Sequence, residues 1–352
     1  MKIGIKTDCD FTRAVGVDNY TLYLVRALMN QGHNLTFYQF KKSSLLKGTN
    51  NHYFRSPLPL PFYRNFASLT HNKCYSDQDL VHFPCPGMDY LIKPKTAVVM
   101  NVHDLMPLIY PGYFPKQARI FFRYFLPKYL KAASALITSS ESAASDICRF
   151  FPSAKKKIHL VYNYIPTKDQ TILYEKKPYI LYLGTIQEKK NIRNILKAFS
   201  ILKSKGFEHQ LILAGKVDNF SLEDVVKQLK IEKDVIYKGY ITEAEKEELL
   251  QNTSLFLWPS YYEGFGYPLL EAMAHGAPII TSNNSSMKEV CKNSGLLVDP
   301  FNPYEIADAA EEVLSSSAVR NDLIKKGLKR SKDYTEKRMT EELIKVYQSV
   351  TR

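Results

Sequence analysis

Residues 254–278 read SLFLWPSYYEGFGYPLLEAMAHGAP. The stretch begins with an apolar run that has the length of a buried strand. Gly264 and Gly266 then allow tight backbone turns close to a ligand. Pro268 suits the first position of a helix, and Gly276 supplies its end. A strand, a glycine loop and a helix in this order form the repeating unit of a parallel α/β sheet, so the stretch predicts that fold class.

Two glutamates, Glu263 and Glu271, lie eight positions apart in this stretch. Glu263 falls in the loop and Glu271 about one turn into the helix, so they are not two rungs of one helix face. Both are expected to border a hollow into which the helix N-terminus points free N–H groups, which suits a phosphate. Carboxylates accept hydrogen bonds from hydroxyls, as on sugars. This combination predicts a pocket for a nucleotide sugar; the alternative is a helix-dipole role for Glu271 and a solvated Glu263.

The alternation of strands and helices continues along the chain in two series, separated by a polar stretch at 163–177. Such βαβα alternation predicts parallel sheets with helices on both faces, here two doubly wound domains in series. A ligand in this arrangement lies outside the carboxyl ends of the strands, in the cleft between the domains. The expected strands lie within 2–7, 34–40, 79–84, 96–104, 134–140 and 157–163, and within 179–185, 210–216, 235–240, 254–260, 277–282 and 295–300.

The composition indicates a globular protein, since 45% of the 352 residues are hydrophobic. The chain is long enough for two domains with sizeable cores. It has no apolar run of signal-peptide length at its start and no run of about 18 apolar residues elsewhere, so we expect a soluble, cytoplasmic protein. The five cysteines are odd in number and scattered, without a metal-type pair, and are expected to be reduced thiols.

The net charge of +13 is concentrated in the first half of the chain. Residues 1–165 hold 21 Lys and Arg against 9 Asp and Glu, whereas the remainder is nearly balanced with 27 against 26. This asymmetry suggests that the first domain faces an anionic partner: nucleotide, nucleic acid or membrane lipid. The alternative is a generally basic proteome. The sequence has no recognisable nucleic-acid-binding module, so nucleic acid is not expected as a partner.

At residues 259–278 the sequence resembles glycosyltransferase family 4, whose members are retaining enzymes of the GT-B fold. The family's signature, two glutamates separated by seven residues around a glycine–phenylalanine–glycine turn, is matched there. The resemblance covers nearly the whole chain and implies two Rossmann-like, doubly wound domains that face a central cleft. It implies domains at 1–165 (acceptor side) and 166–331 (nucleotide sugar), and a helix at 332–352 that crosses back to the first domain. Further similarity lies in 102–115, 134–147, 182–199, 238–250 and 294–314.

The resemblance assigns roles to residues of this signature. It implies that Glu263 holds hydroxyls of the donor sugar and is catalytic. Glu271 is expected to hold the ribose of the nucleotide. The backbone amides around Phe265, Gly266 and Tyr267 are expected to meet the sugar hydroxyls and the phosphate.

Other roles fall outside the signature. The resemblance implies that Lys190 neutralises the diphosphate and that Lys190 and His103 are catalytic together with Glu263. It also implies that Gly16 lets the backbone approach the diphosphate and that the backbone at Ile241 contacts the base. His103 would face the sugar and the reaction centre from the first domain, although a lone histidine at a strand end is usually structural.

One position departs from the family pattern. Many members carry an arginine where this chain has Thr185, which leaves the second phosphate cation in question. Lys189 could substitute for that arginine. Arg193 is also in range, but a solvated helix face explains it better.

The function that the resemblance implies is retaining transfer of a hexose from a nucleotide-diphosphate sugar, GDP- or UDP-linked, to a polysaccharide, lipid-linked or other glycan acceptor. Residues 184–191, GTIQEKKN, favour a mannose-like sugar. No cofactor and no metal are expected, although Asp8–Asp10 and Asp77–Asp79 resemble metal-binding aspartate pairs of another transferase fold. The alternatives are a catalytically idle relative that binds nucleotide sugar, suggested by Thr185, and a nucleotide-sugar epimerase of the same fold.

Residues 114–133, FPKQARIFFRYFLPKYLKAA, interleave basic and aromatic side chains. On a helix, Lys116, Arg119 and Arg123 share a face opposite a bulky apolar one. Residues 54–66, FRSPLPLPFYRNF, add proline-broken aromatic character. One interpretation is peripheral attachment to the anionic inner face of a membrane, where a lipid-linked acceptor is met. The other is a core helix with a solvated basic face.

Overall fold

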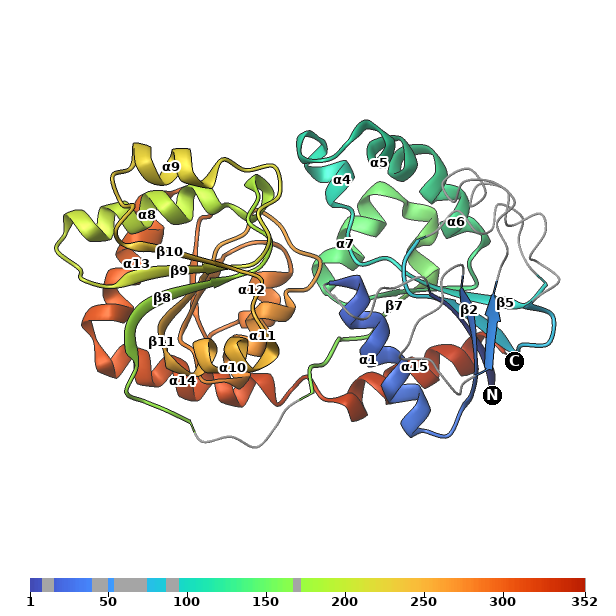
Figure 1. The fold of residues 1–352 in the computed structure, drawn as a ribbon. Helices are drawn as coiled ribbons and strands as arrows, with labels where there is room; N and C mark the ends of the chain where they lie inside the picture. The colour runs from blue at the N-terminus through green and yellow to red at the C-terminus, as the bar shows by residue number, and fades with distance from the viewer. Residues whose placement is uncertain (8–15, 40–49, 54–74, 87–94, 167–171, 352) are drawn as a thin grey trace. The chain divides into compact units, whose positions relative to one another are not determined.

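The computed structural model describes residues 1–7, 16–39, 50–53, 75–86, 95–166 and 172–351. The sequence features at Asp8–Asp10 and at 54–66 lie outside these residues. The chain divides into two compact units, shown in Figure 1: Met1–Tyr164 with Thr335–Arg352 (unit 1) and Ile165–Tyr334 (unit 2). None of the helices within the described ranges combines the length and the apolar character that a membrane crossing requires.

The sheet of unit 1 runs in the order β3-β2-β1-β4-β5-β6-β7 in the described part of the chain, and all neighbouring pairs are parallel. Every residue of β4 and β6 is buried, as expected for strands covered on both faces. The edge strand β3, which the sequence did not predict, is polar and mostly exposed. The strands are β1 (Lys2–Lys6), β2 (Asn34–Gln39), β3 (Asn50–Tyr53), β4 (Leu80–Phe83), β5 (Ala97–Asn101), β6 (Ala135–Thr138) and β7 (Ile158–Leu160).

The predicted helix at 114–133 is interrupted in the structure. A π-helical turn, Phe121–Phe125, separates α5 from α6. Pro127 lacks the N–H that an α-helix would use to bond the carbonyl of Arg123, which explains the wider turn. The helices of unit 1 are α1 (Val17–Asn30), α4 (Met106–Ile109), α5 (Lys116–Ile120), α6 (Leu126–Ala132), α7 (Glu141–Phe150) and α15 (Glu336–Val350), with 3-10 turns at Pro111–Tyr113 and Pro152–Lys157.

The sheet of unit 2 runs in the order β10-β9-β8-β11-β12-β13, again with all pairs parallel. Each of its strands falls within a range predicted from the sequence or overlaps it by all but one or two residues. The predicted fold class, two Rossmann-like doubly wound sheets, is therefore confirmed. The strands are β8 (Lys177–Leu183), β9 (Gln210–Ala214), β10 (Val235–Gly239), β11 (Thr253–Trp258), β12 (Ile279–Ser282) and β13 (Leu296–Val298).

Helices cover both faces of the unit 2 sheet (Figure 1). On one face α8 packs against α9 and α13, and on the other α11 packs against α10 and α14. The helices are α8 (Ile192–Ser204), α9 (Leu222–Gln228), α10 (Glu243–Asn252), α11 (Tyr267–Ala274), α12 (Ser285–Cys291), α13 (Pro303–Ser315) and α14 (Ser317–Ser331), with a 3-10 turn at Glu188–Lys190.

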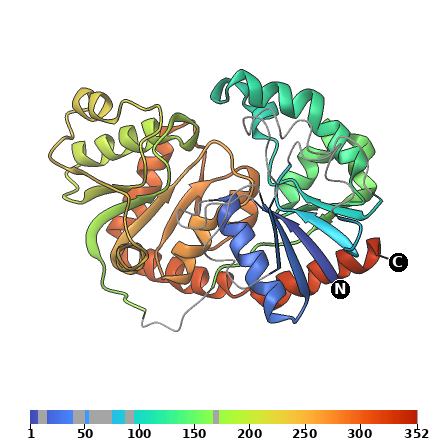
Figure 2. The ribbon, with the colours of Figure 1, turned by 45° about the vertical axis from the view of Figure 1, so that its right-hand side comes forward.

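The last helix, α15, packs within unit 1. It lies beside α1 in both ribbon views (Figures 1 and 2) and contacts it. At its start, Asn30 of α1 donates a hydrogen bond of 2.8 Å to Glu336. Near its end, Tyr347 is fully buried and its hydroxyl lies 2.5 Å from Nδ1 of His82. The C-terminal helix therefore contributes to the core of the unit that contains the N-terminus.

Two glycines bring the chain segments after β8 and β9 into backbone contact. Gly184 and Gly215 have φ values of 144° and 140°, and a Cβ added to Gly215 would lie 2.0 Å from the carbonyl oxygen of Gly184. The N–H of Gly184 donates to the carbonyl of Ala214 at 3.0 Å. This crossing fixes the direction in which the chain leaves β8.

We predict that Gly215→Ala lowers the free energy of unfolding by roughly 2–5 kcal/mol, because the new Cβ collides with backbone and the residue keeps a positive φ. Denaturant unfolding measures the change. Gly112→Ala is the control, since a Cβ there meets nothing within 4 Å. Equal stability of the two variants would contradict the close crossing.

Candidate active site

The loop between β11 and α11 places Glu263 at the carboxyl edge of the unit 2 sheet. Gly266 has a φ of 104° and caps α11, and Pro268 occupies the first turn of the helix. The helix begins at Tyr267, one residue before the predicted start. A left-handed residue at this point turns the chain sharply, so the loop stays compact beside the helix N-terminus.

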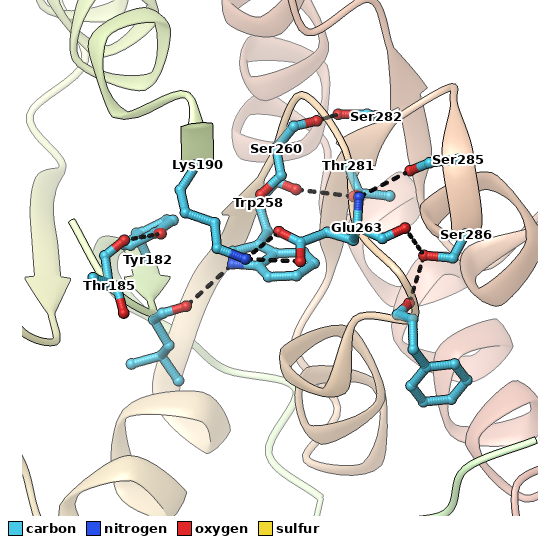
Figure 3. Close-up of polar contacts among 12 residues, drawn as sticks. Tyr182, Thr185, Lys190, Trp258, Ser260, Glu263, Thr281, Ser282, Ser285 and Ser286 are labelled. Carbon is cyan, nitrogen blue, oxygen red and sulfur yellow. Dashed lines mark hydrogen bonds and ion pairs between the residues drawn. The ribbon is translucent and has the colours of Figure 1, made fainter. Parts of the chain in front are cut away.

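Side chains from β12 and α12 hold this loop (Figure 3). Ser286 donates to the carbonyl oxygens of Glu263 at 2.8 Å and of Phe265 at 3.0 Å. The N–H of Glu263 donates to Oγ of Ser285 at 3.2 Å. Ser282 donates to the carbonyl of Ser260 at 2.6 Å. The backbone on both sides of Glu263 is therefore fixed by hydroxyl groups that the sequence analysis did not single out.

Lys190 and Glu263 are 73 positions apart in sequence and form an ion pair (Figure 3). Nζ of Lys190 lies 2.5 Å from Oε1 and 2.7 Å from Oε2 of Glu263. The two side chains are only 21% and 12% exposed. The ammonium group also lies 5.4 Å from the ring centroid of Trp258, within cation–π distance. The structure thus brings together two of the three residues predicted to be catalytic.

Asn191 ties the turn that carries Lys190 to the loop after β11. Its backbone is left-handed, with a φ of 64°. Its Nδ2 donates to the carbonyl oxygens of Pro259 at 2.7 Å and of Pro300 at 2.6 Å. The sequence predicted no role for Asn191. Among residues other than glycine, however, asparagine is one of those that most often adopt a left-handed backbone.

Glu271 has a different lysine partner. Nζ of Lys246 lies 2.8 Å from Oε1 of Glu271 and 2.8 Å from Glu243. Burial by itself lowers the pKa of Lys246, but the charges and hydrogen bonds of the two glutamates outweigh it and raise that pKa above its ordinary value. Lys246 therefore stays charged and holds Glu271, which is 13% exposed. The two predicted glutamates sit in separate ion pairs.

The other predicted donor-site residues of unit 2 follow strand ends. Thr185 and Lys189 are half-buried between β8 and α8, and Ile241 follows β10. The hydroxyl of Tyr182 donates to the carbonyl of Thr185 at 3.0 Å. Burial, and then the charge of Glu263, raise the pKa of Tyr182 well above its ordinary value, so this donor stays protonated.

Phe265 is buried rather than exposed to a ligand. Its ring contacts those of Tyr267 and Tyr334 edge-on, at centroid distances of 5.4 and 5.8 Å. Its side chain therefore packs in the core, and the predicted contact of its backbone amide with a ligand stays a prediction. Arg193 forms an ion pair with Glu188 and lies over the ring of Phe220 at 5.6 Å.

The predicted residues of unit 1 lie at the carboxyl ends of β1 and β5. Gly16 caps α1 with a φ of 55° and is exposed. His103 is half-buried, and its Nε2–H donates to the carbonyl of Pro84 at 2.7 Å. Burial lowers the pKa of His103 to about 4, against a smaller opposing effect of this hydrogen bond. The imidazole is therefore neutral at pH 7, with Nδ1 as its acceptor nitrogen.

The aspartates at Asp77–Asp79 lie at the opposite edge of the unit 1 sheet. They directly precede β4, whereas ligands of parallel sheets bind beyond the carboxyl ends of strands. Asp79 accepts a hydrogen bond from the N–H of Lys2 at 2.8 Å. Within the described ranges, His, Cys, Asp and Glu form no cluster of three or more that could hold a metal ion.

Comparisons with known proteins show which families and folds the chain is similar to. A family model described as glycosyl transferases group 1 matches residues 165–330, and one described as Glycosyltransferase Family 4 matches residues 15–169. The O-antigen chain mannosyltransferase B of Escherichia coli is 27% identical over 99% of each chain. Among solved structures, sucrose-phosphate synthase from Thermosynechococcus elongatus has a TM-score of 0.80 at 18% identity, over 99% of this chain and 98% of that one. Anabaena HepE in complex with UDP and glucose has a TM-score of 0.75 at 15% identity, over 99% of this chain and all of that one.

We predict that Asn191→Ala lowers the free energy of unfolding by roughly 2–4 kcal/mol, because it leaves the buried carbonyl of Pro259 without this donor and strains a left-handed backbone. The carbonyl of Pro300 keeps its hydrogen bond from Asn194 at 3.0 Å. Asn219→Ala is the matched control, because Asn219 is exposed and also left-handed, with a φ of 47°. It should lose only about 1 kcal/mol. Equal losses in denaturant unfolding would show that the hydrogen bonds of Asn191 contribute nothing.

Proposed function

The chain belongs to the group 1 glycosyltransferases of the family 4 type, and we propose that it transfers a hexose from a nucleoside diphosphate to a glycan, with retention and without metal. The observation that carries this proposal is the Lys190–Glu263 pair, held beside the N-terminus of α11. A cation and a helix N-terminus suit a diphosphate, and a carboxylate suits sugar hydroxyls.

The ion pair supports an exchange of partners when the donor binds. A diphosphate competes with Glu263 for the ammonium of Lys190, because both offer anionic oxygens. The carboxylate that loses its lysine then accepts hydrogen bonds from the hydroxyls of the sugar. Trp258, only 2% exposed, keeps the ammonium in place through its ring during this exchange. Glu271 is proposed to hold the ribose in a similar way, in competition with Lys246.

The reaction breaks the bond between the anomeric carbon and the diphosphate oxygen, and the electron pair leaves with the nucleoside diphosphate. The hydroxyl of the acceptor attacks from the face that the leaving group occupies, and its proton passes to the departing diphosphate oxygen. Lys190 and the N–H groups at the start of α11 stabilise the negative charge that develops. His103 is neutral and its Nε2–H is donated to Pro84, so we propose that its Nδ1 accepts a hydrogen bond from a sugar hydroxyl.

The donor and acceptor classes rest on the relatives and on the sequence. The relative that matches the full length is named an O-antigen chain mannosyltransferase, which supports a mannose-like sugar and a polysaccharide or lipid-linked glycan acceptor. We propose a GDP- or UDP-linked donor and no cofactor. The proposed location is the cytoplasm.

We predict that Glu263→Ala lowers the transfer rate by about 100-fold or more, while the Kd for the nucleoside diphosphate does not rise, because the variant removes the carboxylate that competes for Lys190. Glu271→Ala should weaken nucleotide binding by roughly 10–100-fold, since it removes a charged hydrogen-bond partner. Transfer is measured with GDP- and UDP-hexoses, with and without EDTA, and nucleotide binding by thermal shift.

The matched control is Glu248→Ala, which removes a lysine-paired glutamate of α10 that is 67% exposed. It should leave both measurements unchanged. Normal transfer by Glu263→Ala would refute the assignment. Nucleotide binding without transfer by the wild type would favour the idle relative, and a new nucleotide sugar formed without acceptor would favour an epimerase. Loss of transfer in EDTA, restored by Mn²⁺, would refute metal independence.

We also propose peripheral attachment of unit 1 to an anionic membrane through the α4–α6 region, residues 106–132. This segment lies within 105–140, which contains no Asp or Glu. It exposes cations, such as Arg119 and Arg123, and aromatic rings, such as Tyr124, which is 60% exposed. The guanidinium of Arg123 lies 5.8 Å from the ring centroid of Tyr124. Basic and aromatic side chains together suit a negatively charged bilayer surface.

We predict that the protein sediments with vesicles that contain anionic lipid but not with neutral ones, and that 0.5 M salt releases it. Arg119→Glu/Arg123→Glu should abolish binding. Lys155→Glu/Lys156→Glu, which changes the net charge equally at exposed positions of the same unit, should bind like the wild type. Equal loss in both double variants would indicate attraction by net charge alone.

A further inference from the structure

Four buried polar side chains of unit 1 form a continuous chain of hydrogen bonds. The hydroxyl of Tyr347 in α15 lies 2.5 Å from Nδ1 of His82 in β4. Nε2 of His82 lies 2.5 Å from Oδ1 of Asn101 in β5. The hydroxyl of Tyr20 in α1 donates to the same oxygen at 2.9 Å. All four residues are at most 1% exposed, so this chain lies entirely inside the core.

The donor and the acceptor of each of these hydrogen bonds can be assigned, and two of the bonds end at Oδ1 of Asn101. Oδ1 of Asn101 only accepts, so Nε2 of His82 carries the proton and Nδ1 accepts from the hydroxyl of Tyr347. Burial lowers the pKa of His82 to about 4, with smaller opposing and reinforcing effects from Asn101 and His103. The imidazole is therefore neutral at pH 7. Each link joins a neutral donor to a neutral acceptor, which avoids the cost of a buried charge.

The end of this chain at Tyr20 reaches two residues assigned to the site. The ring of Tyr20 meets that of His103 edge-on, at a centroid distance of 4.9 Å and an angle of 73°. The backbone N–H of Tyr20 donates to the carbonyl of Gly16 at 3.1 Å, in the first turn of α1. Tyr20 therefore contacts both His103 and the start of α1. Its hydroxyl bond to Asn101 sets the position of its ring.

A role in packing alone does not explain why this core is polar. Replacing a buried polar group and its partner by apolar groups of the same shape is often neutral or stabilising. Here a histidine, an asparagine and two tyrosines occupy the core, and Nδ2 of Asn101 has no hydrogen-bond partner among the described residues. A network that positions the residue at its end accounts for this arrangement.

We propose that Tyr20 and Asn101 are positioning residues that orient His103 and the Gly16 turn toward the donor, and that His82 and Tyr347 connect them to the C-terminal helix. The inference rests on the proposed function for the identity of the donor. Its structural content, the coupling of Tyr347 to the His103 ring, does not depend on that function.

The test uses Tyr20→Phe and Tyr347→Phe, each of which removes one hydroxyl and keeps the ring. In both variants we expect the imidazole NMR signals of His103, assigned by their loss in His103→Asn, to shift. For transfer we expect kcat to fall about tenfold in Tyr20→Phe and about threefold in Tyr347→Phe, with the donor KM changed less than threefold. Tyr347→Phe remains informative if Tyr20→Phe does not fold.

Tyr164→Phe is the matched control. Tyr164 is a buried tyrosine of the same unit, and its hydroxyl donates to the carbonyl of Tyr23 at 3.3 Å. This hydrogen bond does not belong to the network that joins Tyr347 to Tyr20. It should leave the His103 signals and kcat unchanged. Unshifted His103 signals and an unchanged kcat in both network variants, with only a lower Tm, would overturn the proposal. If the wild type lacks transfer and the two variants still shift the His103 signals, the coupling is upheld and the proposed function is refuted.

Discussion

The ion pair between Lys190 and Glu263 is the constraint that the loops at the carboxyl edge of the unit 2 sheet have to satisfy. Nζ of Lys190 lies 2.5 Å from Oε1 of Glu263, and both side chains are largely buried. Removing either partner would leave a buried charge without compensation. At an effective dielectric constant of about 20, two charges at 4 Å attract by roughly 4 kcal/mol, and removing them from water offsets much of this gain. The pair therefore contributes little net stability. Its position at the carboxyl edge, over Trp258, is better explained by ligand binding than by folding.

This position requires that two distant loops meet accurately. Asn191 fixes the turn before α8 through the carbonyls of Pro259 and Pro300, and Ser286 fixes the loop before α11. Upstream of both, the crossing of Gly184 and Gly215 sets the direction in which the chain leaves β8. These contacts satisfy backbone groups at the carboxyl edge of the sheet, and the carbonyl of Pro300 accepts a second hydrogen bond from Asn194. They therefore fix the positions of the two loops that carry Lys190 and Glu263.

The sequence was sufficient to predict every strand of the described ranges except β3, and the edge of the sheet where Glu263 lies, because apolar runs and glycine turns are local signals. It failed where the signal is weak or lies far away in the chain. The polar edge strand β3 has no apolar run, and the π-helical turn before Pro127 is a detail of hydrogen bonding that periodicity does not show. The resemblance supplied Glu263 and Lys190. The partners Lys246 and His82 could not be predicted, because long-range hydrogen bonds leave no periodic trace.

The two units differ in the charge of their buried polar groups, and this difference affects which anions unit 2 can bind. In unit 2 the lysines that face the predicted site are already paired, Lys190 with Glu263 and Lys246 with Glu271. A weakly charged anion cannot compete with these carboxylates, whereas a diphosphate with several anionic oxygens can, especially where N–H groups also donate. Pairing therefore discriminates against simple anions despite the basic composition of the chain. In unit 1 the buried chain of hydrogen bonds that ends beside His103 is neutral, so no counter-charge is needed there. The neutral imidazole of His103 therefore carries no positive charge that would attract a phosphate to unit 1.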